Sequence, residues 1–160
     1  MKIERATTEH AEALTNIAFA AKRHWNYPES WIAGWTQLLT ITPEYIATNE
    51  VYAAFSGTLP IGFYAMVVTP DTADLDHLWV HPRFIGTGVG RQLFEHAVRT
   101  AREAEITRFT IESDPNAEGF YRRMGAVAIG QTVTEIEGQK RFLPIYLFTI
   151  PADDQSRASG

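Results

Sequence analysis

The apolar residues follow strand-like and helical spacings in turn, which predicts an α/β protein with the order β-α-α-β-β-β-α-β-α-β-β. Strands are expected at residues 2–6, 51–55, 61–68, 73–80, 108–113, 127–134 and 142–150. Helices are expected to begin near Thr8, Ser30, Thr42, Gly88 and Ala117, the first three with a hydroxyl side chain as N-cap. Because residues 142–150 are mostly apolar, this last strand is predicted to lie inside the sheet.

Residues 78–91 form the most informative stretch, since a strand runs through a glycine-rich turn into an amphipathic helix. Glycines such as Gly86 and Gly88 let the backbone approach a ligand with no Cβ in the way. The first turn of a helix carries amides without acceptors and the positive end of the dipole. The stretch therefore predicts a site for a phosphate or pyrophosphate.

Two familiar phosphate loops do not fit this stretch. A Walker A loop needs Gly-Lys-Ser/Thr, but Gly90 is followed by Arg91 and Gln92. A dinucleotide fingerprint needs Gly-x-Gly-x-x-Gly, and Arg91 stands where the last glycine would be. A glycine-rich turn with no ligand is the remaining alternative.

Composition narrows the classes of function. The 160 residues fit one domain, predicted as 1–150, with 151–160 as a disordered tail. Fourteen Lys and Arg against nineteen Asp and Glu give a net charge of −5, which argues against nucleic-acid or membrane partners. The absence of cysteine excludes thiolate nucleophiles, and no histidine spacing indicates a metal. With no signal-like or membrane-spanning run, the expected location is the cytoplasm.

Two segments together resemble the signatures of the GNAT superfamily of N-acetyltransferases. Val80-x-Pro82, followed by Gly86-x-Gly88-Val89-Gly90-x-x-Leu93, is similar to that family's acetyl-CoA pyrophosphate loop. The second segment, 114–126, resembles the family's Phe-Tyr-x-x-x-Gly helix end. The resemblance covers residues 3–150. It implies a mixed, mostly antiparallel central sheet flanked by helices, with acetyl-CoA as co-substrate and no metal.

The resemblance also implies which residues hold acetyl-CoA. They are Leu78, Trp79, Val80, Arg83, Gly86, Thr87, Gly88, Val89, Gly90, Arg91 and Asn116. The chain departs from the family at Ile85, where Gln or Arg is usual, and Arg83 is expected to supply that charge. Asn116 stands five residues before Tyr121 rather than the usual seven, so a helix N-cap is an equally supported role for it.

Acetylation of an amine by direct attack needs a base for the amine proton and an acid for the departing thiolate. The lack of cysteine agrees with direct transfer rather than a covalent acyl-enzyme. By resemblance, Tyr121 matches the family's acid. The alternative is a packed core tyrosine.

Strand alternation guides the choice of base. It places Asp74 and Asp76 on one face of residues 73–80, together with Leu78 and Val80, and His77 on the other face. Asp76 is therefore the first choice, followed by Glu112, which matches another carboxylate position of the family, and then Asp74. His77 is expected to be packed or hydrogen-bonded.

The acceptor pocket, by resemblance, is formed by the first two helices, the connection between them and the last hairpin. Trp31 and Trp35 are expected to be core, on one helix face with Leu38, whereas Trp25 and Tyr27 are expected to form an exposed aromatic wall. Such a wall suits a small or partly apolar amine.

The sequence favours an acetyl-CoA-dependent N-acetyltransferase that acts on a primary amine of a small molecule or peptide. The alternative is a non-catalytic acyl-CoA-binding regulatory module. A homodimer is the working hypothesis for assembly. The acceptor and the use of larger acyl groups are left open by the sequence.

Overall fold

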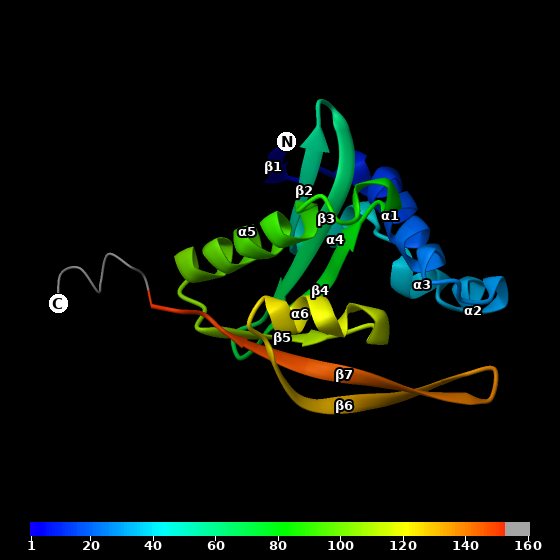
Figure 1. Ribbon diagram of the computed structural model, residues 1–160. Helices are drawn as coiled ribbons and strands as arrows, with labels where there is room; N and C mark the ends of the chain where they lie inside the picture. Colours follow the sequence, from blue (N-terminus) through cyan, green and yellow to red (C-terminus); the bar gives the residue numbers. More distant parts are fainter. Residues whose placement is uncertain (153–160) are drawn as a thin grey trace.

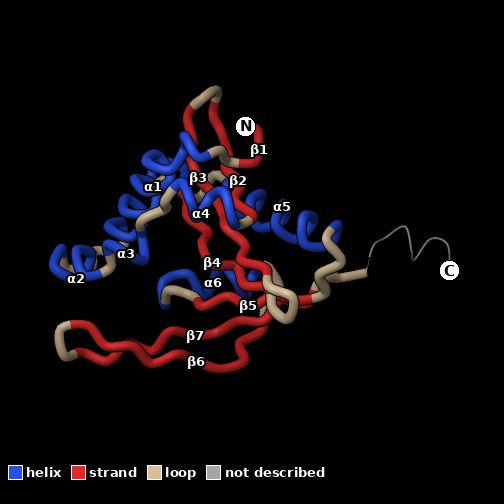
Figure 2. The backbone as a smooth tube through the Cα atoms, turned by 180° about the vertical axis from the view of Figure 1, so that it is seen from behind, coloured by secondary structure: helices blue, strands red, loops and turns tan. Residues whose placement is uncertain are grey.

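A seven-stranded sheet with helices on both faces organises the chain in the computed structural model, which describes residues 1–152 (Figures 1 and 2). The strand order is β1-β2-β3-β4-β5-β7-β6, and only the β4–β5 pair is parallel. The strands are β1 (Lys2–Arg5), β2 (Glu50–Ser56), β3 (Leu59–Val68), β4 (Ala73–Val80), β5 (Arg108–Glu112), β6 (Val127–Ile136) and β7 (Gln139–Thr149). The mixed, mostly antiparallel sheet expected from the sequence is confirmed. β7 lies between β5 and β6, as expected, and β6 forms the edge.

Helices lie on both faces of the sheet (Figures 1 and 2). The α-helices are α1 (Ala11–His24), α2 (Glu29–Gly34), α3 (Thr36–Leu39), α4 (Pro43–Thr48), α5 (Val89–Glu103) and α6 (Glu118–Arg123). Short 3-10 turns are η1 (Thr8–His10), η2 (Pro82–Phe84) and η3 (Pro115–Ala117). The tail predicted from residue 151 onward reaches beyond the described part of the chain, since residues 153–160 lie outside it.

Each face of the sheet has its own hydrophobic core. On one face, α5 and α6 pack through residues such as Leu93, Phe94 and Tyr121. On the other, α1 to α4 pack through Leu14, Ile32 and their neighbours. Full burial of one large apolar side chain stabilises a fold by about 1.5–3 kcal/mol, so the two cores together fix the helices on the sheet.

The parallel pair β4–β5 opens soon after it forms. Asp74 pairs with Thr110, and β4 makes no further ladder contact with β5 among the described residues. From there β4 continues beside β3, while β5 runs beside β7 (Figure 1). The edge of β4 that faces β5 therefore keeps free backbone N–H and C=O groups.

Several local expectations were wrong. Thr7, not Thr8, precedes the first helical turn, and Ser30 lies inside α2, which follows Pro28. The second predicted helix is interrupted at Trp35, so Leu38 is 70% exposed instead of sharing a buried face. Only the Thr42 cap is confirmed: its hydroxyl accepts a hydrogen bond from the Tyr45 amide.

Candidate active site

The glycine-rich turn joins β4 to α5 through η2 and two left-handed glycines. Gly86 has φ +81° and Gly88, the N-cap of α5, has φ +92°. A Cβ at either position would meet no atom of the described residues within 4 Å, so these glycines are required by backbone conformation and not by crowding. No side chain caps α5.

The backbone amides of this turn are available to a ligand. Thr87 N donates to Phe84 O at 3.3 Å, but no acceptor among the described residues faces the amides of Gly88, Val89, Gly90 and Arg91. They stand at the N-terminus of a fifteen-residue helix, where the helix dipole favours negative charge. The geometry fits an anion such as a phosphate group.

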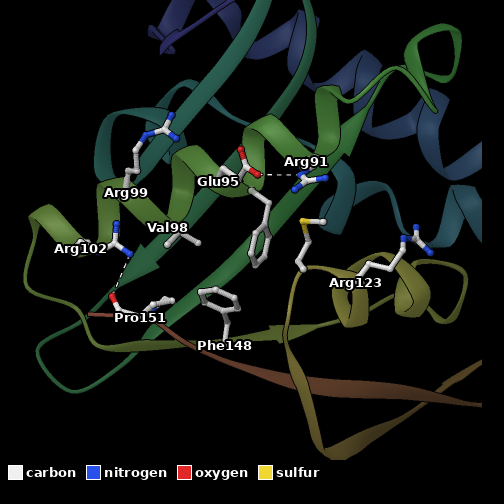
Figure 3. A pocket seen from close by; sticks show the side chains of 10 residues that line it. Arg91, Glu95, Val98, Arg99, Arg102, Arg123, Phe148 and Pro151 are labelled. Carbon is white, nitrogen blue, oxygen red and sulfur yellow. Dashed lines mark hydrogen bonds and ion pairs between the residues drawn. The ribbon is translucent and has the colours of Figure 1, made fainter. Parts of the chain in front are cut away.

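Four arginines line a pocket along α5, but Arg91 stands in the first turn of the helix, while Arg99 and Arg102 stand toward its C-terminal end. This pocket has a volume of about 310 Å³, and Arg91, Arg99, Arg102 and Arg123 are among its lining residues (Figure 3). Arg91, one of the predicted cofactor residues, stands in the first turn of α5 and pairs with Glu95 at 3.0 Å. Arg83 is exposed in η2, and its amide donates to the His81 ring.

The predicted alternation of β4 was wrong because β4 contains a bulge. His77 pairs with Ala65 and Leu75 pairs with Met66, which leaves Asp76 as the extra residue. Leu75, Leu78 and Val80 consequently all pack on the α5 face. Asp76 instead accepts a hydrogen bond from the Tyr45 hydroxyl of α4, so it lies on the opposite face from Leu78 and Val80.

The candidate bases on β4 are exposed. Asp76 has a side chain that is 46% exposed, and Asp74, which accepts from Thr110, is exposed too. Glu112 accepts from Thr132 at 3.0 Å. Asp74 of β4 pairs with Thr110 of the parallel strand β5. Asp76 and Glu112 therefore each lie two residues beyond this pair, on β4 and β5 respectively. Asp76 lies beside the β4–β5 opening, whereas the Glu112 carboxylate is directed toward Thr132 of β6, away from β4.

His77 is hydrogen-bonded, as expected. Its ring accepts from Trp79 Nε1 at 2.9 Å, and its Nε2 lies 3.6 Å from Asp76. Burial lowers the pKa of His77 and outweighs the nearby Asp76 charge. A neutral ring that already accepts one hydrogen bond is typical of a structural histidine.

Tyr121 is both a core residue and a candidate acid. It is 6% exposed and packs against Phe94, Phe120 and Tyr146. Its hydroxyl donates to no acceptor among the described residues, and it is not sealed from solvent. Burial, with a further contribution from the Asp114 charge, raises the pKa of the phenol, so the proton is retained.

Asn116 does not cap a helix. Asp114 is the residue that caps η3, accepting from the Asn116 amide at 2.8 Å. The Asn116 side chain donates to Tyr27 and to Asp114, each at 3.0 Å. The N-cap alternative was therefore wrong, and the Asn116 amide belongs to a polar group around Asp114.

Sequence analysis missed that polar group, which lies beyond the ends of β4 and β5. Lys22, Asp114 and Arg141 come together there, with side chains only 8–11% exposed. Lys22 could have been recognised, since it extends the apolar stripe of Leu14, Ala18 and Ala21 at helical spacing. Arg141 carries no such signal in the sequence.

The expected exposed aromatic wall was only half right. Trp25 is 37% exposed. Tyr27, however, packs edge-on against Trp35 with ring centroids 5.1 Å apart, and its hydroxyl donates to Asp114 at 3.0 Å. Trp35 is buried, as expected. Tyr27 thus belongs to the wall of the polar group rather than to an outer surface.

Two features are absent from residues 1–152. No group of three or more His, Asp or Glu side chains there is arranged to hold a metal ion. No helix in that range is both long and apolar enough to cross a membrane.

The sheet order, the opening between β4 and β5 and the glycine turn before α5 define a GNAT-like acyltransferase fold. The chain belongs to the GNAT acetyltransferase family: residues 37–139 match the family model described as the acetyltransferase (GNAT) domain. Both segments on which the sequence resemblance rested lie inside this match.

Individual relatives agree with this membership. The peptidyl-lysine N-acetyltransferase YjaB of Escherichia coli is 31% identical over 97 residues, which cover 61% of this chain and 58% of YjaB. The chain spans about half the length of the curated relatives it matches. A GCN5-related N-acetyltransferase from Rhodopseudomonas palustris superposes with a TM-score of 0.73 at 21% identity, covering 92% of this chain and 94% of that one. The PaiA N-acetyltransferase of Thermoplasma acidophilum, solved with coenzyme A, superposes with a TM-score of 0.70 at 18% identity, covering 90% of this chain and 96% of that one.

Proposed function

We propose that the protein is an N-acetyltransferase that moves the acetyl group of acetyl-CoA directly to a primary amine. The observation that carries the proposal is the turn at residues 86–91, with two left-handed glycines and unpaired amides at the start of α5. This arrangement suits a pyrophosphate, and Arg91 in the first turn of α5 adds positive charge in a chain whose net charge is −5.

The residues proposed to hold the co-substrate follow from this arrangement. Gly86, Thr87, Gly88, Val89, Gly90 and Arg91 would surround the pyrophosphate, with Arg83 close by. The free edge of β4 at Leu78, Trp79 and Val80 offers backbone groups to the amide-containing arm of the coenzyme. Asn116 is the weakest member of the set, since its side chain is already engaged by Tyr27 and Asp114.

The chemistry requires one new bond and two proton transfers. The amine nitrogen bonds to the acetyl carbon, the carbon–sulfur bond breaks, and the electron pair leaves with the sulfur. Asp76 or Glu112, through water, would take the amine proton, and Tyr121 would give a proton to the thiolate. Their exposure suits a base that works through water, and the raised pKa of Tyr121 keeps its proton available.

A non-catalytic acyl-CoA-binding module is the second candidate. It would need the turn but neither a carboxylate beside the β4–β5 opening nor a buried phenol with an unpaired hydroxyl. The acceptor is left as a primary amine, either of a small molecule or of a peptide. The cytoplasmic location and the homodimer stay predictions.

Release of free CoA thiol from acetyl-CoA, measured with and without a panel of amines, tests the proposal. An N-acetyltransferase releases thiol in step with acetylated amine, which mass spectrometry identifies. Tight acetyl-CoA binding without amine-dependent thiol release would favour the binding module.

A further inference from the structure

The polar group beyond β4 and β5 joins side chains from three distant parts of the chain. Lys22 comes from α1, Tyr27 from the loop after it, Asp114 from the segment after β5, and Arg141 from β7. Lys22 Nζ donates to Asp114 at 2.6 Å, and Arg141 Nη2 lies 3.9 Å from the same carboxylate. We call Lys22, Asp114 and Arg141 the charged cluster.

The charged cluster contains two basic side chains and one carboxylate. No second acidic side chain among the described residues forms an ion pair with Lys22 or Arg141. Aromatic rings offset part of the cost of burial: Trp35 lies 4.4 Å from Lys22 Nζ and 4.7 Å from Arg141 Cζ, measured to the ring centroid. Buried charges are normally paired, so the cluster is suited to an additional anion.

Arg141 is the member of the cluster with unused hydrogen-bonding capacity. Its guanidinium has five N–H donors, and the one hydrogen bond found for it in residues 1–152 runs from Nη2 to the Tyr27 hydroxyl at 2.9 Å. None of its nitrogen atoms is both unpaired and sealed from solvent. The free donors can therefore be reached from outside, and the planar guanidinium matches a carboxylate in a two-bond pairing.

The charged cluster lies beside the groups proposed for catalysis. Asp114 follows Glu112 by two residues, and its charge contributes to the raised pKa of Tyr121. On the β4 side, the Trp79 ring lies 5.9 Å from Lys22 Nζ. An anion bound at Arg141 would thus belong to a molecule whose other end is near the β4–β5 opening.

We propose that Arg141 binds a carboxylate of the acceptor, so that the acceptors are primary amines that also carry a carboxylate. Lys22 and Asp114 are positioning residues that hold Arg141 and Tyr27 in place. The identity of the acceptor class rests on the proposed N-acetyltransferase function, whereas carboxylate binding by Arg141 does not depend on it.

Matched pairs of amines test the acceptor class by steady-state kinetics. The pairs are glycine and glycinamide, phenylalanine and phenylalaninamide, and the dipeptide Gly-Phe and its C-terminal amide. The wild type is expected to prefer the acid of a pair by roughly tenfold or more in kcat/KM, as for a hydrogen bond to a charged group. An amide lowers the basicity of the neighbouring amine, which favours the amide, so a preference for the acid cannot come from amine reactivity. Comparing kcat/KM for the free amino acids with kcat/KM for the dipeptide shows whether the acceptor is an amino acid or a peptide terminus.

Variants assign that preference to one side chain. Arg141→Gln should raise KM for the acid roughly 10- to 100-fold and leave KM for the amide and for acetyl-CoA unchanged. Arg141→Lys keeps the charge but loses the planar pairing. Its KM for the acid should therefore lie between the values of Arg141→Gln and the wild type. Lys140→Gln is the matched control, because it removes an exposed cation from the neighbouring position of β7 and should change neither KM.

A binding measurement without turnover separates this inference from the proposed function. Phenylacetate carries a carboxylate but no amine, and phenylacetamide is its neutral counterpart. Tryptophan emission, to which Trp35 contributes beside Arg141, should change saturably with phenylacetate, much less with phenylacetamide, and not in Arg141→Gln.

Saturable phenylacetate binding without acetylation of any amine would leave the carboxylate site standing and count against the proposed function. Equal use of acid and amide by the wild type would overturn the inference. So would a folded Arg141→Gln protein with lower thermal stability but an unchanged acid preference, because that is the behaviour of a purely structural ion cluster.

Discussion

At the scale of single residues, Tyr121 combines two properties that seldom occur together. It is a buried ring in the core under α5, and its hydroxyl has no hydrogen-bond partner in residues 1–152. Burial raises the pKa of the phenol, which makes it a weak acid that stays protonated at neutral pH. Such a hydroxyl can still stabilise the charge that develops on a leaving group in the transition state, and stabilising the transition state speeds a reaction.

Tyr121→Phe removes the hydroxyl and keeps the ring. Turnover is expected to fall roughly 10- to 1000-fold, while the melting temperature changes little because no hydrogen bond is lost. Steady-state kinetics and a thermal melt on the same sample check both parts. Full activity in a folded variant would reduce Tyr121 to a packing residue.

Tyr64→Phe provides the control for that variant. Tyr64 is equally buried in the same core, but its hydroxyl bonds to His96 at 2.7 Å and to Thr100 at 3.2 Å. Its loss should lower stability by about 1 kcal/mol and leave turnover unchanged.

At the scale of elements, the strand-to-helix segment was predicted well and the strand before it was not. The glycines, the cap position and the apolar stripe of α5 all follow local rules, so the turn and helix could be read from the sequence. The bulge at Asp76 could not, because it depends on how β4 pairs with β3. One extra residue moved Asp76 to the face of α4 and separated it from Leu78 and Val80.

Amide substitutions distinguish the two candidate bases, Asp76 and Glu112. Asp76→Asn keeps the acceptor oxygen for Tyr45 but cannot take a proton, so turnover should fall roughly 100- to 10,000-fold with little change in acetyl-CoA affinity. Glu112→Gln, the equivalent change on β5, should have a smaller effect. Kinetics of both variants at saturating acetyl-CoA decide between them, and the opposite ranking would assign the base to Glu112.

At the scale of the whole molecule, Asp114 connects segments that local patterns could not bring together. Its carboxylate accepts hydrogen bonds from Lys22 of α1, Tyr27 of the following loop and Asn116 of η3, and it lies near Arg141 of β7. The sequence indicated each element but not that these side chains meet, because their convergence requires the complete sheet order. The charged cluster is therefore a property of the tertiary structure alone.

Asp114→Asn should cost about 3–5 kcal/mol of unfolding free energy at neutral pH, because it leaves two buried cations without a carboxylate. Burial alone would raise the pKa of Asp114, but the Lys22 charge and the hydrogen bonds it receives outweigh this and lower it. Its stabilising contribution is thus present above the unfolded value of about 3.9 and is lost as the pH falls toward the lower folded pKa.

Urea denaturation between pH 7 and pH 3 measures this effect. The difference between wild type and Asp114→Asn should be largest at neutral pH and should shrink as the solution becomes acidic. Asp71→Asn, at an exposed loop position, is the matched control and should leave the curve unchanged. If the difference in unfolding free energy between wild type and Asp114→Asn stayed constant from pH 7 to pH 3, the stabilising role of the Asp114 charge would be contradicted.

The proposed function depends on acetyl-CoA binding at the turn formed by residues 86–91, and calorimetric titration of two glycine variants tests this binding. Gly88→Val and Gly57→Val each put a branched side chain at a left-handed position with open space around it, so both carry a similar strain of about 1–3 kcal/mol. Gly57 lies in the β2–β3 turn, away from α5. Gly88→Val should raise the Kd for acetyl-CoA roughly tenfold or more while Gly57→Val leaves it unchanged, in proteins that are both folded. Normal acetyl-CoA affinity in folded Gly88→Val, or an equal loss in both variants, would contradict acetyl-CoA binding at this turn.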